Sequence, residues 1–200
     1  MSFFLLISRG IDRLNQSVGY LTTWLILATT LISAGNAIVR KAFDSSSNAL
    51  LEIQWYLFAA VFLLGAGYGL LKNSHVRIDF ISSMLTPRTR NWIDVGGILL
   101  ALFPFCAICI YLSWPLFMQA YTTGEMSSNA GGLIRWPVYA LVPAGFALLM
   151  LQGVSELIKR LDFLLGQGED ALSSEEAMSD EQKELLALEK LAQEQAQGAR

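Results

Sequence analysis

Four long apolar runs make up most of the chain, and none of them contains Lys or Arg. They cover residues 18–39, 50–71, 92–117 and 138–158. A hydrocarbon core about 30 Å thick needs about 20 helical residues, so each run is long enough to cross a bilayer. The runs lack the alternation of apolar and polar residues that membrane β-strands show. Because lipid cannot satisfy backbone polar groups, the sequence predicts an all-α membrane protein with four transmembrane helices.

The first 17 residues form a separate segment in this interpretation. Ile7, Ile11 and Leu14 recur at helical spacing, while charged residues such as Asp12 and Arg13 occupy other faces. This pattern is typical of an amphipathic helix in the membrane interface. A frayed leader is the alternative.

The last 40 residues have a different composition. Residues 161–200 contain ten Asp and Glu against three Lys and Arg, in a chain whose formal net charge is −3. We expect a polar cytoplasmic tail with a short helix at about residues 180–195. The sequence leaves open whether this tail is simply solvated or binds a partner. The four-span membrane domain then covers residues 18–160.

The distribution of basic residues predicts the orientation. Eight Lys and Arg flank the spans on one side and three on the other. By the positive-inside rule, both termini should be cytoplasmic. The eight are Arg9, Arg13, Lys72, Arg77, Arg88, Arg90, Lys159 and Arg160, and the three are Arg40, Lys41 and Arg135.

Groups that could support catalysis are scarce. His75 is the only histidine, so a haem held by two histidines of this chain is excluded, and a zinc site lacks ligands. We expect no cofactor, no metal and no nucleic-acid partner. Cys106 and Cys109 have a C-x-x-C spacing, which leaves a thiol-redox membrane enzyme as one alternative. Their position in the middle of the third run favours small apolar core residues.

Polar residues at the ends of the runs are the candidate site residues. Asn36 and Arg40 end the first run, and Glu52 begins the second after a short connection. A carboxylate at that depth is costly unless it is paired, so the sequence predicts an interaction between Glu52 and Arg40. This pair could be structural or could handle solute.

Two further segments contribute candidates. His75, Arg77 and Asp79 alternate with apolar residues at the headgroup level, where Arg77 could contact lipid phosphate or a partner acid. Arg135 and Trp136 end a connection rich in turn residues, with Trp136 at the interface before the fourth run. That connection could dock a partner or only return the chain to the membrane.

Several of these residues occur in motifs that resemble the small membrane subunit of tripartite ATP-independent periplasmic (TRAP) transporters, the DctQ-like family. The resemblance covers roughly residues 11–159, and the acidic tail falls outside it. The motifs are Asn36 with Arg40, Glu52 with Trp55, the run from His75 to Asp79, Gly131-Gly132-Leu133-Ile134-Arg135-Trp136-Pro137, Pro143 with Gly145 and Phe146, and Leu151-Gln152-Gly153.

The resemblance implies a subunit of the bacterial inner membrane with no enzyme activity. It implies two protein partners, a large multi-span permease subunit and a periplasmic solute-binding protein, with sodium-coupled uptake of an organic acid or related solute in the large subunit. The small subunit would be a scaffold that also contacts phospholipid. A stand-alone small transporter is the remaining alternative.

Overall fold

The computed structural model describes residues 2–43, 47–73 and 85–166, and these are helical except for their connections. Four helical stretches are long and apolar enough to cross a membrane, which confirms the predicted all-α, four-span class. The elements are α1 (Ser2–Phe43), α2 (Asn48–Leu71), α4 (Pro87–Gly97), a π-helix (Ile98–Leu102), α5 (Phe103–Thr123) and α6 (Trp136–Leu164).

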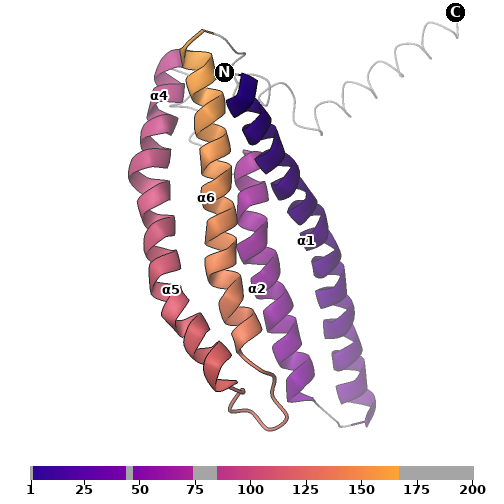
Figure 1. Cartoon of the computed structure of the whole chain (residues 1–200). Coiled ribbons are helices and arrows are strands. Elements are labelled where there is room, and N and C mark those ends of the chain that lie inside the picture. Colours follow the sequence, from indigo (N-terminus) through magenta and orange to yellow (C-terminus); the bar gives the residue numbers. More distant parts are fainter. Residues whose placement is uncertain (1, 44–46, 74–84, 167–200) are drawn as a thin grey trace, which may run out of the picture.

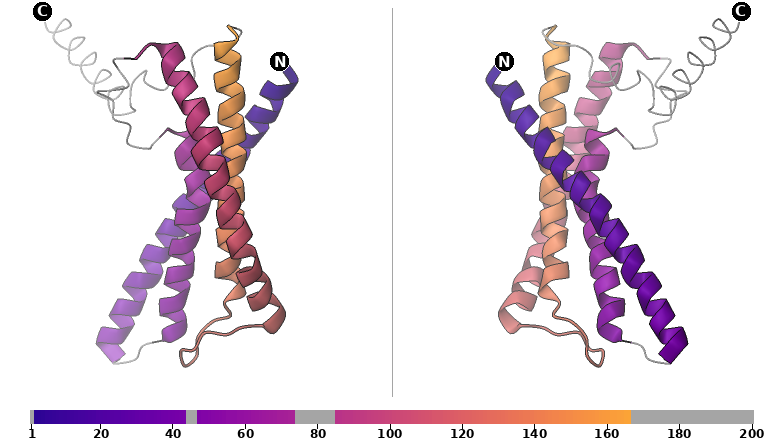
Figure 2. Two further views of the ribbon diagram at one scale, coloured as in Figure 1. Left: turned by 90° about the vertical axis from the view of Figure 1, so that its left-hand side faces the viewer. Right: turned by 90° about the vertical axis from the view of Figure 1, so that its right-hand side faces the viewer.

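The spans form an open arrangement in which α6 is the shared neighbour. Helix α6 packs against α1, α2 and α5, while α1 packs mainly on α2. Figure 2 shows α1 crossing α6 obliquely, so that α1 and α2 diverge from α5 and α6 toward one end. We call this the loop end, because it carries the connection of residues 124–135 between α5 and α6; the other is the N-terminal end.

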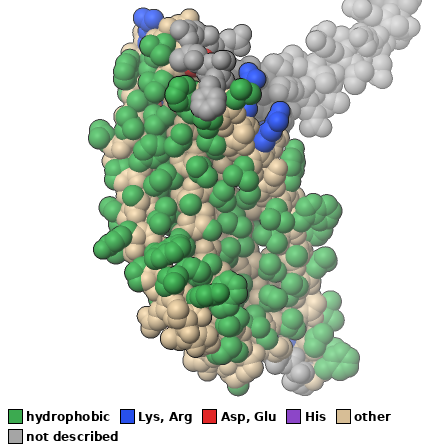
Figure 3. Space-filling model, viewed as in Figure 1, with side chains coloured by type: hydrophobic (Ala, Val, Ile, Leu, Met, Phe, Trp, Pro, Cys, Tyr) green, Lys and Arg blue, Asp and Glu red, His purple; other side chains and the backbone are tan. Residues whose placement is uncertain are grey.

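The outer surface suits a lipid environment. Hydrophobic side chains are spread over the whole length of the face seen in Figure 3, and the Lys and Arg visible there lie mainly near the N-terminal end. Large apolar side chains such as Trp24, Phe58 and Tyr111 are more than 65% exposed. In water such exposure would be unusual for a monomer, whereas acyl chains cover it at no cost.

The N-terminal segment differs from its prediction. Helix α1 is one continuous helix of 42 residues, so there is no separate helix over residues 1–17. Ser8 and Asn15 of this segment are buried against α6, where both find hydrogen-bond partners. Ser8 and Asn15 therefore face protein, whereas Arg9 and Arg13 are exposed. That this segment lies in the membrane interface stays a prediction.

Helix α6 extends past residue 160, after which the polar tail is predicted to begin. It ends at Leu164, and Arg160 and Asp162 are buried. The acidic residues beyond position 166, including the short helix expected there, lie outside the described residues.

The third span contains an irregularity directly before Pro104. Pro104 has no N–H to donate to the carbonyl four residues earlier, and its ring crowds that carbonyl. Just before it, residues Ile98–Leu102 form a π-helix, in which the Phe103 N–H donates to the Ile98 carbonyl five residues back. Helix α5 then continues through Pro115 without a break. Such single π-helical turns are one of the standard ways in which a long helix bends.

Glycine lets α6 approach its neighbours closely. A Cβ atom added to Gly145 would lie 2.6 Å from the Leu63 carbonyl oxygen of α2, and one added to Gly153 would lie 2.9 Å from Leu102 in the π-helix. Such contacts leave no room for a side chain. Close approach of backbones through small residues is a main source of helix association in membranes.

We predict that Gly145→Ala destabilises the protein, because the new methyl group meets backbone that cannot rotate away. The expected loss is about 1–3 kcal/mol, measured from thermal unfolding of the purified protein in detergent. Gly35→Ala is the matched control, since nothing lies within 4 Å of the added Cβ there. Equal melting temperatures for the two variants would contradict the close packing of α2 and α6.

Candidate functional site

The connection between α5 and α6 folds into a hairpin-like loop. Gly124 adopts a left-handed conformation (φ 62°) that ends α5, and Met126 and Ile134 form an antiparallel bridge. The Ser127 N–H donates to the Leu133 carbonyl at 2.9 Å. Gly131 at the far side has φ 71°, which suits glycine because it has no Cβ. The loop therefore has a defined shape of its own.

Glu52 holds this loop against the start of α2. One oxygen, Oε2, accepts a 2.7 Å hydrogen bond from the Leu133 N–H. The other, Oε1, accepts from the Asn129 side-chain amide at 2.7 Å and from the Ser127 hydroxyl. Hydrogen bonds to an ionised carboxylate are stronger than those between neutral groups. A single carboxylate thus ties together both arms of the loop.

Two more side chains on the same face of α2 bind the loop. Asn48, one turn before Glu52, donates to the Ala130 carbonyl at 3.0 Å, and Tyr56, one turn after it, donates to the Ile134 carbonyl at 3.1 Å. Residues four apart lie above one another on a helix. The first two turns of α2 therefore provide a row of hydrogen-bonding groups along the loop.

Arg40 is not the partner of Glu52, so this prediction is wrong. No ion pair joins the two among the described residues, and Arg40 is exposed at the end of α1. Closeness in sequence was a poor guide, because the loop brings Arg135 toward Glu52 from 83 positions away. Arg135 itself forms a 2.9 Å ion pair with Glu125, and this hydrogen bond raises the pKa of the guanidinium.

The remaining predicted site residues do not form one cluster. Trp136 begins α6 and packs edge-on against Tyr121, with ring centroids 5.6 Å apart. Trp55 is 77% exposed on α2, whereas Asn36 is buried and its side-chain oxygen has no hydrogen-bond partner among the described residues. The other three predicted residues, His75, Arg77 and Asp79, lie outside the described part of the chain.

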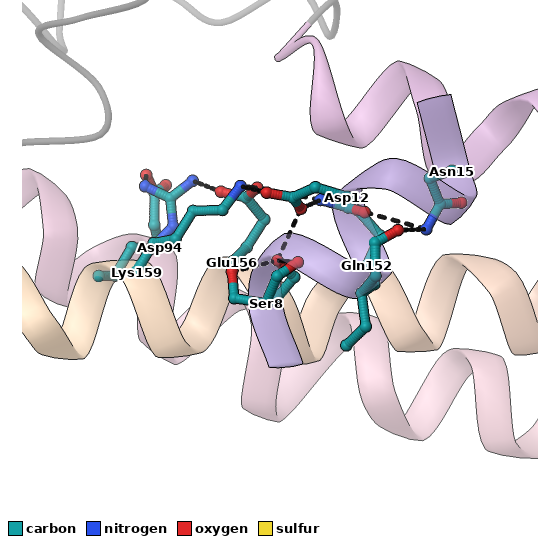
Figure 4. Close-up of polar contacts among 10 residues, drawn as sticks. Ser8, Asp12, Asn15, Asp94, Gln152, Glu156 and Lys159 are labelled. Carbon is teal, nitrogen blue, oxygen red and sulfur yellow. Dashed lines mark hydrogen bonds and ion pairs between the residues drawn. The ribbon is translucent and has the colours of Figure 1, made fainter. Parts of the chain in front are cut away.

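A second polar cluster lies near the N-terminal end and joins α1, α4 and α6 (Figure 4). The Lys159 ammonium lies 3.0 Å from the Asp12 carboxylate of α1 and 2.8 Å from that of Glu156. Arg160, only 2% exposed, lies 2.9 Å from Asp94 of α4. We call this cluster the polar layer; it comprises Ser8, Asp12, Asn15, Asp94, Gln152, Ser155, Glu156, Lys159 and Arg160.

Neutral side chains complete the polar layer between α1 and α6. Gln152 is fully buried; it donates to Asp12 at 2.9 Å and accepts from Asn15 at 3.0 Å. The Ser155 hydroxyl donates to Asp12 at 2.7 Å and lies 2.7 Å from the Ser8 hydroxyl. Asp12 therefore contacts three side chains of α6: Gln152, Ser155 and Lys159. Arg160, the most buried charge of the layer, keeps its Nε without a hydrogen-bond partner among the described residues.

The polar layer was not predicted from the sequence, although a signal was present. Ser8, Asp12 and Asn15 are spaced four and three residues apart, as are Gln152, Ser155 and Lys159 with spacings of three and four. Each set lies along one face of a helix. Two polar stripes in apolar helices predict that the helices meet there.

The described residues give little support to metal or thiol chemistry. They contain no group of three or more His, Cys, Asp or Glu that could hold a metal ion. Cys106 is buried, Cys109 is partly exposed, and neither forms a disulfide. Both thiols lie within the third span, away from the two polar clusters.

Comparison with protein families matches residues 29–163 to a family described as tripartite ATP-independent periplasmic transporters, DctQ component. The chain belongs to this DctQ family. This family consists of transporter subunits rather than enzymes, and the four apolar helices agree with a multi-pass protein of the inner membrane.

The chain is also similar in sequence to a curated protein. The chain is similar to the C4-dicarboxylate TRAP transporter small permease protein DctQ of Pseudomonas aeruginosa, with 25% identity over 134 residues. The alignment covers 66% of this chain and 62% of that relative. The family match includes Glu52 and its loop but begins after the α1 residues of the polar layer.

We predict that Glu52→Gln loosens the loop, because the amide replaces a charged acceptor of three hydrogen bonds. Hydrogen exchange of the Leu133 amide should accelerate by roughly tenfold. Glu125→Gln is the matched control, since it removes the ion pair with Arg135 but leaves the Glu52 contacts in place. If both variants exchange at the wild-type rate, Glu52 does not hold the loop.

We also predict that Asp12→Asn weakens the association of α1 with α6, because Lys159 loses a counter-ion while it is only 23% exposed. The expected loss is about 1–3 kcal/mol of stability in detergent. Arg13→Gln, on the exposed side of the same turn, should have little effect. Combining Asp12→Asn with Lys159→Met should cost less than the sum of the two single changes; strict additivity would exclude direct coupling.

Proposed function

We propose that this DctQ-family chain is a scaffold for the large multi-span permease subunit of a TRAP transporter. The complex would take up an organic acid or related small solute, coupled to an ion gradient that is most simply sodium. A periplasmic solute-binding protein would deliver the solute. The relative's C4-dicarboxylates are the first substrate class to test.

One observation supports this proposal above the others: the charged residues of the membrane domain lie near the ends of the spans. No Asp, Glu, Lys or Arg occurs between Arg13 and Arg40, between Glu52 and Lys72, between Asp94 and Glu125, or between Arg135 and Glu156. Transport sites for ions and organic acids usually require ionisable or exposed backbone groups near the midplane. A scaffold does not require them.

The pairing of the charges gives the same support. Glu52 is bound by the loop at one end, and Asp12 and Lys159 are bound within the polar layer at the other. Groups already committed to internal partners are poorly placed to bind and release solute. They are well placed to keep the helices in fixed relative positions while a partner moves.

The expected orientation fits this role. With both termini in the cytoplasm, the loop end faces the periplasm and the polar layer lies near the cytoplasmic side. Phospholipid contact is expected at the cytoplasmic interface, where Arg77 is the predicted residue.

Flux measurements in proteoliposomes test the proposal. The chain alone should carry no C4-dicarboxylate under an imposed sodium gradient, whereas the small and large subunits together, supplied with the binding protein, should. Omitting the small subunit should abolish or strongly reduce uptake. Solute flux by the isolated chain would favour the stand-alone transporter, and full activity of the large subunit alone would refute a scaffold role.

A further inference from the structure

The charged side chains at the N-terminal end are separated by sign. All four Asp and Glu described there are buried or half-buried: Asp12, Asp94, Glu156 and Asp162. By contrast, every charged side chain in the exposed class among the described residues of this end is basic. These exposed residues are Arg9, Arg13, Lys72 and Arg88. The acidic groups are therefore shielded within the protein, and the outer surface of this end is positively charged.

Two of the exposed basic residues form a pair on α1. Arg9 and Arg13 are four positions apart, so their side chains lie above one another on the helix surface. The neighbouring Asp12 faces α6 instead, where its carboxylate pairs with Lys159. Neither guanidinium of the pair has an ion-pair partner among the described residues. Two adjacent positive charges without a counter-ion attract an anion.

The chain itself carries an anion directly after α6. Residues 169–181 contain six Asp and Glu and no Lys or Arg; we call this segment the acidic block. All of residues 167–200 together contain nine Asp and Glu against three Lys and Arg, a net charge of −6. The three basic residues follow the acidic block, so they do not interrupt its charge.

Helix α6 ends close to the arginine pair. The start of α1 and the end of α6 lie at the same end of the molecule (Figure 1), and Lys159 of α6 lies 3.0 Å from Asp12 of α1. Gly166, the last described residue, is seven positions beyond Lys159, which corresponds to about 10 Å along the helix direction. The acidic block begins three residues and ends 15 residues after Gly166, an extended reach of roughly 10–50 Å. It can therefore return to Arg9 and Arg13.

We propose that the acidic block binds back onto Arg9 and Arg13 and keeps anionic phospholipid away from them. With both termini in the cytoplasm, these arginines lie beside the negatively charged cytoplasmic leaflet, which repels an unpaired acidic block. Pairing with the arginines relieves part of this repulsion. The inference goes beyond the scaffold function and does not depend on it.

Anionic phospholipid is the competing partner, because a headgroup phosphate also pairs with a guanidinium. The acidic block differs in carrying six carboxylates on one connected segment. Its attachment to α6 keeps these carboxylates at an effective concentration in roughly the millimolar range. Loss of one contact therefore does not release the segment, whereas a single lipid that loses its contact diffuses away.

Photo-crosslinking in the full-length chain tests the contact. The photoreactive amino acid p-benzoylphenylalanine replaces Gly10, which is exposed and has nothing within 4 Å of an added Cβ. The protein is reconstituted at one copy per nanodisc in phosphatidylcholine mixed with phosphatidylglycerol. We expect the main adduct to join position 10 to residues 169–181, as mapped by mass spectrometry. Adducts with phosphatidylglycerol alone, or with no part of the acidic block, would overturn the inference.

Charge variants of the helices test whether the arginine pair is the docking site. Arg9→Gln combined with Arg13→Gln should lower the yield of the adduct by at least about threefold, because both positive charges are lost. Lys72→Gln combined with Arg88→Gln is the matched control, since it removes the same charge from the same end but leaves α1 unchanged. An equal loss in both double variants would show a general attraction and contradict docking at the pair.

Charge variants of the tail test the other partner. Replacing Glu175, Glu176 and Glu181 by Gln should weaken the adduct with the acidic block and increase the adduct with phosphatidylglycerol. The same change at Glu184, Glu189 and Glu194, outside the block, is the matched control and should have little effect. An adduct that stays at the wild-type level after the first change would refute the inference. These variants leave α1 intact, so they decide the question if the arginine variants do not fold.

Discussion

A polar group inside a bilayer must find its partner within the protein, and this constraint determines the interior of the molecule. Among the described residues, most fully buried side chains are polar or charged, such as Asn15, Gln152 and Arg160, while large apolar side chains face outward. This is the reverse of a water-soluble domain. Because lipid is as apolar as leucine, burial of apolar surface does little to hold the helices together. Hydrogen bonds, ion pairs and close glycine contacts do so instead.

Helix α6 makes all three kinds of contact: hydrogen bonds, ion pairs and close glycine contacts. Its glycines allow α2 and the π-helix to approach closely. Gln152 and Ser155 of α6 form hydrogen bonds with α1, and Arg160 forms an ion pair with Asp94 of α4. Figure 1 shows α6 between the α1–α2 pair and α5. The Glu52 contacts add a second connection at the loop end. In the proposed complex, the α6 and Glu52 contacts would hold α1 and α2 in place. The outer surfaces of these two helices would stay free to contact a partner.

The sequence was sufficient to predict the four spans, because uncharged apolar runs of this length are rare outside membrane helices. It also indicated Glu52, since a carboxylate at that depth requires partners. It could not identify those partners: Ser127, Asn129 and Leu133 are more than 70 positions away, and only the folded loop brings them to α2. The contacts of the N-terminal segment were not predicted for a related reason. Its partners lie on α6, about 140 positions away, where Asp12 and Asn15 meet Lys159 and Gln152.

The spacing of the two polar clusters along α6 gives the subunit a fixed height. Arg135 and Glu156 are separated by 21 positions on the helix, which corresponds to roughly 30 Å, the thickness of the hydrocarbon core. Sliding the protein up or down would draw a charged cluster into the lipid tails at one side and expose apolar surface at the other. The thickness of the bilayer therefore favours one depth for this chain, and a neighbouring protein that moved along the membrane normal would move relative to it.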